Sequence, residues 1–404
     1  MAAMAAVAAA CGSSSTSSGG GSSSGPSLQQ WYHEYGEKGT EQAAKQFAAS
    51  YKKARVAVQW TPGDYATKLS AGLLSSSGPD VYESQFNVQM ARSKQAVPLD
   101  DIIAPYKHDF NAYDIKANTY DGHTYGVRII DDPQFFYYRK SLFDKKGLKP
   151  PETLDDLISI AKELTTSSMK GIFLGNDAGA GAMAGPALWS TAQRYLTPDH
   201  KVGFDSPRTG EVFQKLRQLQ TDKSILLGAP TDWTDEGSFT NQLCAIQWCG
   251  LWGMPTIKSA LGDDFDVFPF PKFDSKGQDV VYSGGWTEFV NGKSHHIEAA
   301  KEYVKYLWLT STKIQEQWAL DYGYHIPPRI SVAAGAKPLQ SGPAKHAVEL
   351  AKTYGVGDEP YWTPNVSVGY GDMVTNILRK GQAPGPQISK AASIATKALK
   401  QLGV

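Results

Sequence analysis

Strand-like and helix-like segments alternate from residue 28 onward, and this alternation constrains the fold more than any other feature of the sequence. The expected order is a strand at 28–32, a helix at 40–51, a strand at 56–59, a helix at 64–74 and a strand that begins after the turn at 78–80. Both helices carry apolar residues three or four positions apart, and Asp64 stands where it can cap the second helix. Because strand–helix–strand units usually return to a parallel neighbour, this order predicts an α/β fold with a mostly parallel sheet covered by helices.

The rest of the chain continues with the same two kinds of element. Expected strands cover 125–127, 134–138, 171–174, 244–248, 280–283 and 286–290, and expected helices cover 153–164, 209–220, 236–242, 255–261, 297–309, 312–322, 344–354 and 388–402. The first of these helices follows Pro150-Pro151 and has Thr153 as its expected cap. A chain of 404 residues exceeds what one compact core usually holds, so two lobes are expected.

Charge and cysteine content exclude several classes of function. Lys+Arg and Asp+Glu are both 40, so the formal net charge is zero. The chain therefore lacks the excess of positive charge that is typical of nucleic-acid-binding proteins. The three cysteines match no zinc or redox spacing, and no metal or cofactor site is predicted. Cys244 and Cys249 lie in one expected strand, where five residues span roughly 16 Å, beyond the reach of a disulfide. They are therefore predicted to be free, buried thiols.

The first 26 residues indicate export and anchoring. Small residues at Ala8-Ala9-Ala10 precede Cys11, as in a bacterial lipobox, and a Gly/Ser tract from Gly12 to Gly25 follows as a flexible tether. We therefore expect residues 1–26 to comprise a signal remnant, a lipobox and a tether, with Cys11 as the lipidated residue. No Lys or Arg precedes Cys11, which departs from a complete signal peptide, and the alternative is a disordered alanine-rich tail.

Short segments spread along the whole chain resemble the extracellular solute-binding proteins of family 1, the group that includes maltose-binding protein. The segments are Gly78–Glu83, Tyr125–Val127 with Phe135–Phe143, Lys149–Thr153, Ser283–Trp286, Ala299–Val304 and Gly323–Arg329. The segments occur in the family's order. Arg128 stands where the family has proline and Asp155 where it has tryptophan, which leaves the ligand subclass open.

The resemblance implies a two-lobed periplasmic-binding-protein fold of type II with the ligand in a cleft between the lobes. Lobe one would hold residues 27–130 plus 283–327, and lobe two residues 134–280 plus 330–404. It further implies a non-enzymatic, monomeric protein on the extracellular face of the cell membrane, tethered there only by its lipid. The protein would capture a carbohydrate and deliver it to the permease subunits of an ABC importer.

Sugar recognition requires an aromatic ring for the C–H face of the sugar and planar polar groups for its hydroxyls. Polar and aromatic side chains at strand ends and at the expected crossings between lobes meet this requirement, because α/β sheets place ligands at the carboxyl ends of strands. The candidate ligand-binding residues are Trp31, His33, Glu34, Glu83, Gln85, Asp132, Gln134, Asn176, Asp177, Trp248, Trp252, Gly285, Trp286, His325 and Arg329. Trp308 and Trp318 lie on amphipathic helices and are expected in the core.

Two other classes of function remain open. A secreted glycoside hydrolase would need two carboxylates about 5–10 Å apart across the scissile bond. Asp131 with Asp132, or Asp235 with Glu236, could be proposed, but adjacent residues rarely face one bond from both sides. A surface adhesin would explain the tether but not the tryptophans at strand ends.

Overall fold

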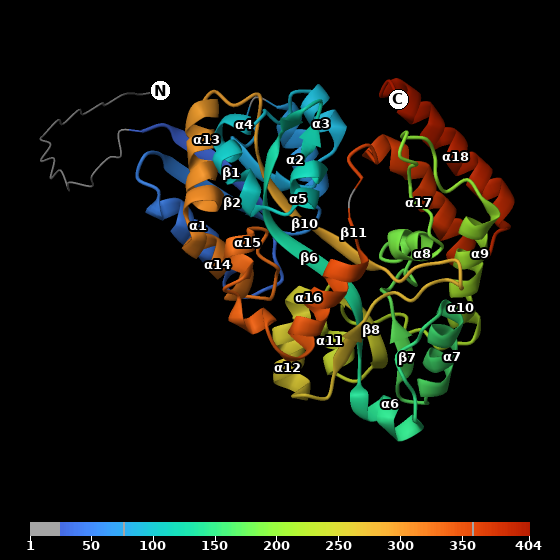
Figure 1. Ribbon diagram of the computed structural model, residues 1–404. Coiled ribbons are helices and arrows are strands. Elements are labelled where there is room, and N and C mark those ends of the chain that lie inside the picture. The colour runs from blue at the N-terminus through green and yellow to red at the C-terminus, as the bar shows by residue number, and fades with distance from the viewer. Residues whose placement is uncertain (1–24, 76, 358) are drawn as a thin grey trace, which may run out of the picture.

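One sheet of nine strands runs through the whole protein. The computed structural model (Figure 1) describes residues 25–75, 77–357 and 359–404. The strand order is β2 (Arg55–Thr61), β1 (Ser27–His33), β3 (Val81–Ser84), β10 (Val281–Val290), β6 (Gly126–Tyr138), β8 (Cys244–Gly250) and β7 (Lys170–Phe173). β9 (Asp266–Phe268) pairs with β6, β11 (Gly355–Val356) pairs with β10, and β4 (Thr119–Tyr120) and β5 (His123–Thr124) form a separate small sheet.

The sheet is mixed, which corrects the expectation of mostly parallel strands. β1 is parallel to β2 and β3, and β7 is parallel to β8, as the alternating strand and helix order predicts. β10 is antiparallel to β3 and β6, and β6 is antiparallel to β8 and β9. The difference arises because β6 and β10 are not part of local strand–helix–strand units: their pairing joins segments that are far apart in the sequence.

β6 and β10 connect the two ends of the molecule. Each replaces two short strands expected from the sequence: β6 continues through Pro133, and β10 continues through Gly284-Gly285. In the register Gly285 pairs with Asp131, and a Cβ on Gly285 would lie 2.2 Å from the carbonyl oxygen of Ile130. Pro133 and the two glycines do not end the strands, because the long antiparallel pairing of β6 with β10 keeps both strands extended. A third connection runs beside β6, where Asp131 and Ile326 exchange two backbone hydrogen bonds of 2.9 Å.

We call the part of the sheet with β2, β1 and β3, together with its helices, the first lobe, and the part with β8 and β7, together with its helices, the second lobe. The helices of the first lobe are α1 (Thr40–Ser50), α2 (Tyr65–Leu74), α3 (Val88–Arg92), α4 (Asp100–Ile103), α5 (Ala112–Ala117), α13 (Ile297–Lys305) and α14 (Thr312–Leu320). Asp64 caps α2 as expected, by accepting from the backbone N–H of Thr67 at 3.0 Å. The helix expected at 297–309 is α13 followed by a π-helical turn at Tyr306–Thr310.

The helices of the second lobe are α6 (Lys140–Lys146), α7 (Leu154–Leu164), α8 (Ala184–Ser190), α9 (Pro207–Leu216), α10 (Gln218–Thr221), α11 (Gly237–Thr240), α12 (Met254–Leu261), α16 (Gly342–Tyr354), α17 (Pro364–Leu378) and α18 (Pro384–Gln401). Thr153 and Asp156 form a reciprocal capping box at the start of α7. α17 was not expected from the sequence. The short helix α15 (Ile330–Ala333) follows the third connection, and Figure 1 shows β6 and β10 running between the two lobes.

The hydrophobic core is divided in the same way as the helices. Two clusters of buried side chains belong to the first lobe, among them Trp308 and Trp318, which are buried as predicted. Two further clusters belong to the second lobe. Cys244 and Cys249 are free thiols buried in β8, which confirms the prediction for both. Each lobe therefore has a core of its own. Each large apolar side chain that is buried in these cores contributes about 1.5–3 kcal/mol to the stability of its lobe.

The expected lipobox and tether lie outside the described residues, except for Gly25 and Pro26. Within the ranges that the structure describes, no helix combines the length and apolar character needed to cross a bilayer.

Candidate functional site

A cavity of about 870 Å³ lies where the sheet passes from one lobe to the other. Both lobes contribute to its wall, and we call it the primary cavity. Nine of the predicted ligand-binding residues line it: His33, Glu34, Gln85, Asp132, Gln134, Trp252, Gly285, Trp286 and His325. The remaining wall residues, which sequence reasoning did not select, are Tyr35, Gly36, Glu37, Lys38, Trp233, Thr234, Asp235, Glu236, Thr256, Tyr282 and Tyr322.

An aromatic face forms the wall on the side of the first lobe. The ring of Trp286 stacks on that of His33, with the centroids 3.9 Å apart and the planes at 19°. His33 is the last residue of β1, and Trp286 lies on β10 directly after Gly284-Gly285. Both side chains are only partly buried, so an apolar face remains open to the cavity.

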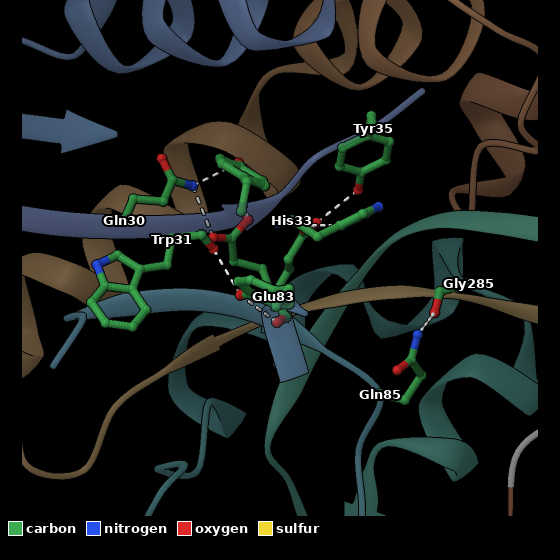
Figure 2. A network of polar contacts seen from close by, with 10 residues as sticks. Gln30, Trp31, His33, Tyr35, Glu83, Gln85 and Gly285 are labelled. Carbon is green, nitrogen blue, oxygen red and sulfur yellow. Dashed lines mark hydrogen bonds and ion pairs between the residues drawn. The ribbon is translucent and has the colours of Figure 1, made fainter. Parts of the chain in front are cut away.

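Glu83 lies behind this face and holds it in place. Its side chain is fully buried, and its Oε1 accepts from the backbone N–H of His33 at 2.8 Å and contacts His33 Nδ1. Its Oε2 accepts from the hydroxyl of Tyr35 at 2.7 Å, and Figure 2 shows these contacts. Glu83 therefore does not line the cavity, contrary to the prediction. It orients two residues that do, and the buried position follows from its place inside β3.

A second buried carboxylate, Glu288, lies opposite Glu83 in the register of β3 and β10. It accepts from Gln30 Nε2 and Trp308 Nε1, both at 2.8 Å, and from the hydroxyl of Tyr32 at 3.3 Å. Burial raises the pKa of Glu288, and the negative charge of Glu83 raises it further. The hydrogen bonds from Gln30, Trp308 and Tyr32 lower it, but burial outweighs them, and the resulting pKa is about 8. This buried network lies directly across the strand pair from Glu83, the residue that holds the aromatic face.

His325 joins two carboxylates at the edge of the cavity. Its Nδ1 contacts Asp132 of β6, and its Nε2 lies 3.1 Å from Oε1 of Glu37 in the loop after β1. Burial alone lowers the pKa of His325, but Asp132 and Glu37 outweigh that effect and raise the pKa to about 10. For Glu37, an acid, burial has the opposite effect and raises the pKa, but the hydrogen bond and the charge of His325 bring the pKa below its usual value. The three groups therefore form a carboxylate–imidazolium–carboxylate chain at neutral pH.

The second lobe supplies two tryptophans and two carboxylates. The rings of Trp233 and Trp252 lie 6.3 Å apart at 55°, and Trp252 Nε1 donates to the carbonyl oxygen of Thr234 at 2.9 Å. Burial raises the pKa of Glu236 above its usual value. Gly250 leaves room for this arrangement, because a Cβ there would lie 1.9 Å from the Trp252 ring.

Six predicted ligand-binding residues do not line the primary cavity, and five of them besides Glu83 have structural surroundings that explain this. Trp248 is fully buried and packs edge-on against Phe136, with its Nε1 3.3 Å from Gln134 Oε1. Trp31 packs with the cluster around α2, where its ring occupies the space beside Gly72.

The other three residues fasten loops. Asn176 donates to the carbonyl oxygens of Ala229 and Thr231, both at 3.1 Å. Asp177 accepts from the backbone N–H groups of Gly179 and Gly181. Arg329 donates to Asp109 at 2.8 Å and to the carbonyl oxygen of Leu309 at 2.9 Å, so it anchors the third connection to the first lobe.

The missed wall residues carried a signal of the same kind as those selected. Residues 233–236 combine a tryptophan with carboxylates, much as residues 31–34 combine aromatic side chains with Glu34, and Glu37 and Lys38 lie only a few residues after Glu34. The sequence suggests Asp235 and Glu236 only as a possible catalytic pair of a hydrolase. Tyr322 lies just after α14, and nothing local in the sequence indicates that it faces the cavity.

Comparison with known proteins agrees with this architecture. The sequence profile of the bacterial extracellular solute-binding protein family matches residues 30–316. A multiple sugar-binding protein of Streptococcus mutans is 24% identical over 297 residues, which cover 69% of each chain. The melibiose/raffinose/stachyose-binding protein of Bacillus subtilis is 20% identical over 315 residues, 70% of this chain and 73% of the relative.

Solved structures match over nearly the whole chain. An ABC transporter solute-binding protein of Thermotoga lettingae bound to α-D-tagatose has a TM-score of 0.79 at 22% identity and covers 93% of this chain and 100% of its own. The GacH receptor of Streptomyces glaucescens has a TM-score of 0.78 at 22% identity, with 93% and 99% covered. These likenesses confirm the predicted two-lobed fold of type II. With the family profile spanning more than half of its length, this chain belongs to the bacterial extracellular solute-binding proteins.

Proposed function

We propose that this protein captures a carbohydrate in the primary cavity and delivers it to the permease of an ABC importer. The observation that carries the proposal is the Trp286–His33 face, which lies in one cavity with Asp132 and Glu37. An apolar ring face covers the C–H side of a pyranose, and carboxylates accept hydrogen bonds from its hydroxyls.

Asp132 and Glu37 can accept hydrogen bonds from sugar hydroxyls, and His325 already fixes the positions of both carboxylates. His325 holds Asp132 and Glu37, so neither carboxylate needs to be ordered when the ligand enters. Pre-ordering lowers the entropic cost of binding. Gln85 and Gln134 add amide groups that donate and accept, and Trp233 with Trp252 adds a second aromatic surface on the opposite lobe.

The proposal includes closure of the lobes around the sugar. We take residues 27–130 plus 283–327 as one moving unit and 134–280 plus 330–404 as the other. The separate cores of the lobes and the contribution of both lobes to the cavity support this division. A sugar that contacts both walls binds the closed form more tightly, so it shifts the population toward that form, as in periplasmic binding proteins.

The names of the relatives support a carbohydrate as the ligand. Two relatives are described as binding proteins for multiple sugars and for melibiose, raffinose and stachyose, and a further relative as an arabinooligosaccharide-binding protein. Structural neighbours hold tagatose, and acarbose or its homologue. The proposed role is therefore transport without catalysis, and the ligand should leave the protein chemically unchanged.

A thermal-shift screen of the full chain tests the function. The panel contains neutral mono- to tetrasaccharides, sugar phosphates and amino acids. Ligand at 100 times its Kd adds about 2.7 kcal/mol to the free energy of unfolding, which is a readable rise in Tm. We expect one class of neutral sugar to raise Tm and to be recovered intact. A panel without any shift by a sugar contradicts the proposal, and a sugar recovered in cleaved form indicates a hydrolase.

The Trp286→Ala variant tests the aromatic face. We expect Kd for the sugar found in the screen to rise at least tenfold, because the ring face is lost. Trp31→Ala is the matched control: Trp31 is also a partly buried strand tryptophan beside the same cluster, but it lies outside the cavity. Equal effects of the two substitutions on Kd would remove Trp286 from the site.

We further propose that Cys11 carries a lipid, that the protein is held on the extracellular face of the cell membrane, and that it acts as a monomer. The cysteine, the small residues before it and the Gly/Ser tract support the anchor. Expression of the wild type and of Cys11→Ala in a Gram-positive host, followed by membrane fractionation, tests it. The wild type should sediment with membranes and the variant should appear in the medium, while sedimentation of both would contradict lipid anchoring at Cys11.

A further inference from the structure

A second cavity, of about 610 Å³, lies next to the primary cavity and shares Gln85 and Tyr282 with it. We propose that it holds the further units of the ligand, which is then a neutral oligosaccharide of at least three sugar units. This inference rests on the proposed function, because it takes the primary cavity as the site of the first sugar.

The two cavities lie on the same face of β10. Tyr282 and Trp286 are four residues apart on this strand, and side chains separated by an even number of residues point to the same side. Trp286 lines the primary cavity, and Tyr282 lines both. Gln85 stands beside them, with its Nε2 3.3 Å from the carbonyl oxygen of Gly285, as Figure 2 shows. A chain-like ligand can therefore run past Gln85 and Tyr282 without crossing the sheet.

Both lobes also enclose the second cavity. The first lobe contributes Ala66, Leu69, Ser70 and Leu73 of α2 and the residues after β3, and the second lobe contributes the start of α17 and a group of aromatic rings. Tyr195 stacks on Trp362 with the centroids 4.3 Å apart at 3°, and Trp189 stacks on Tyr282 at 5.9 Å and 8°. Trp189 is buried behind Tyr282, whereas Tyr195, Tyr282 and Trp362 are partly exposed. Partly exposed rings that border a groove suit the C–H faces of successive sugars.

The charges of the two cavities differ, and the difference indicates the class of ligand. Five carboxylates border the primary cavity, those of Glu34, Glu37, Asp132, Asp235 and Glu236, and they outnumber its two cations, Lys38 and His325. The described lining of the second cavity holds no Lys or Arg and one carboxylate, Glu359, which accepts from the backbone N–H of Leu196 at 3.0 Å. Its other polar groups are neutral: Ser70, Ser84, Gln85, Asn87, Gln89, Gln95, Asn365 and Ser367.

Neutral amides and hydroxyls match uncharged sugar hydroxyls, and they offer no counter-charge to a phosphate, a sulfate or a uronic acid. Repulsion by the carboxylates of the primary cavity disfavours such anions further. The first sugar would therefore be held mainly by charge-assisted hydrogen bonds and the following sugars by stacking and neutral hydrogen bonds. Affinity should rise with chain length until the second cavity is filled.

Calorimetry with neutral oligosaccharides of one to five units tests this inference on the full chain. The series are α-1,4-glucans, β-1,4-mannans, α-1,5-arabinans and the raffinose series. For the series that binds, we expect Kd to fall at least tenfold between one and three units and then to level off. The acidic counterpart, an oligogalacturonate of the same length, should bind at least tenfold more weakly than the best neutral trisaccharide.

Two tryptophan substitutions on α2 separate the cavities. Ser70→Trp fills the second cavity from an exposed position, whereas Ala71→Trp adds the same ring at an exposed neighbour outside it. Ser70→Trp should abolish the gain in affinity with length and leave Kd for the monosaccharide within twofold of wild type. Ala71→Trp should change neither, and thermal melts of both variants confirm that they fold.

The outcomes distinguish this inference from the proposed function. Binding that is equally tight at every length, or an equal loss of short and long ligands in Ser70→Trp, overturns the second cavity as a subsite while the sugar receptor stands. Absence of binding by every neutral sugar contradicts the proposed function itself.

Discussion

His325 and Asp132 are 193 residues apart in the sequence, and in the folded protein the imidazole of one contacts the carboxylate of the other. The contact joins the third connection between the lobes to β6 at the wall of the primary cavity. Glu37 completes the arrangement from the loop after β1, so three separate segments meet at one buried positive charge. This relationship fixes two carboxylates that line the primary cavity, and it contributes to stability.

Replacing His325 by Leu should destabilise the protein, because two buried carboxylates lose their common cation. Removing one partner of a buried ion pair typically costs about 3–5 kcal/mol. We expect a loss of this size in the free energy of unfolding at pH 7, measured by urea denaturation. His295→Leu, at an exposed site, is the control and should change stability by less than about 0.5 kcal/mol.

The same group gives a pH dependence in the alkaline range. The pKa of His325 is raised to about 10 in the folded protein, above the value of about 6.5 for an unfolded histidine. Its contribution to stability is therefore fully present below pH 6.5 and is lost as the pH rises through 10. Between pH 7 and 9.5 the difference in unfolding free energy between wild type and His325→Gln should shrink by up to about 1.4 kcal/mol per pH unit. A difference that stays constant over this range contradicts a protonated His325.

Glu288 should make the protein more stable at mildly acidic pH. Its folded pKa of about 8 exceeds the unfolded value near 4.5, so its contribution is fully present below pH 4.5 and is lost as the pH rises through 8. Relative to Glu288→Gln, which resembles the protonated acid, the wild type should lose up to about 1.4 kcal/mol per pH unit between pH 5 and 8. Denaturation of both proteins across this range measures the slope, and parallel curves would assign an ordinary pKa to Glu288.

Glu83→Gln should weaken ligand binding although Glu83 does not touch the cavity. The amide cannot accept at both positions, so His33 and Tyr35 lose one of their fixed partners and the Trp286–His33 stack loosens. We expect Kd, measured by calorimetry, to rise about tenfold, because the aromatic face is no longer held by two accepted hydrogen bonds. Glu41→Gln, on the exposed face of α1, is the control. An unchanged Kd would show that Glu83 does not position the aromatic face.

Gly250→Ala should displace Trp252 from the cavity wall. The added Cβ would lie 1.9 Å from a ring carbon of Trp252, so the ring has to move. Kd should rise at least tenfold, as measured by calorimetry. At Gly371 in α17 a Cβ meets no atom within 4 Å, so Gly371→Ala should leave Kd unchanged and match or slightly exceed wild-type stability. A Gly250→Ala protein that binds as tightly as wild type would show that Trp252 does not contribute to binding.

Local signals in the sequence predicted the elements that local interactions stabilise. The caps Asp64 and Thr153 begin their helices as expected, and the first three strands and two helices follow the predicted order. The intrinsic propensities of Gly284, Gly285 and Pro133 predict that a strand ends there, yet all three lie inside long strands. Cross-strand pairing outweighs the local preference there, and pairing partners cannot be read from one segment alone.

The sequence by itself determined the order of strands and helices, the caps, the free thiols and the residues at strand ends from which the site is built. Only the tertiary structure decided which of those side chains face the cavity. Trp248 and Trp286 both lie on strands, but other elements bury Trp248 completely, while Trp286 stays partly open on His33. The tertiary structure also brought His325 between Asp132 and Glu37. The physical reason is that strand periodicity assigns a residue to one face of the sheet, whereas the elements packed on that face, which come from distant parts of the chain, decide whether it is core or cavity.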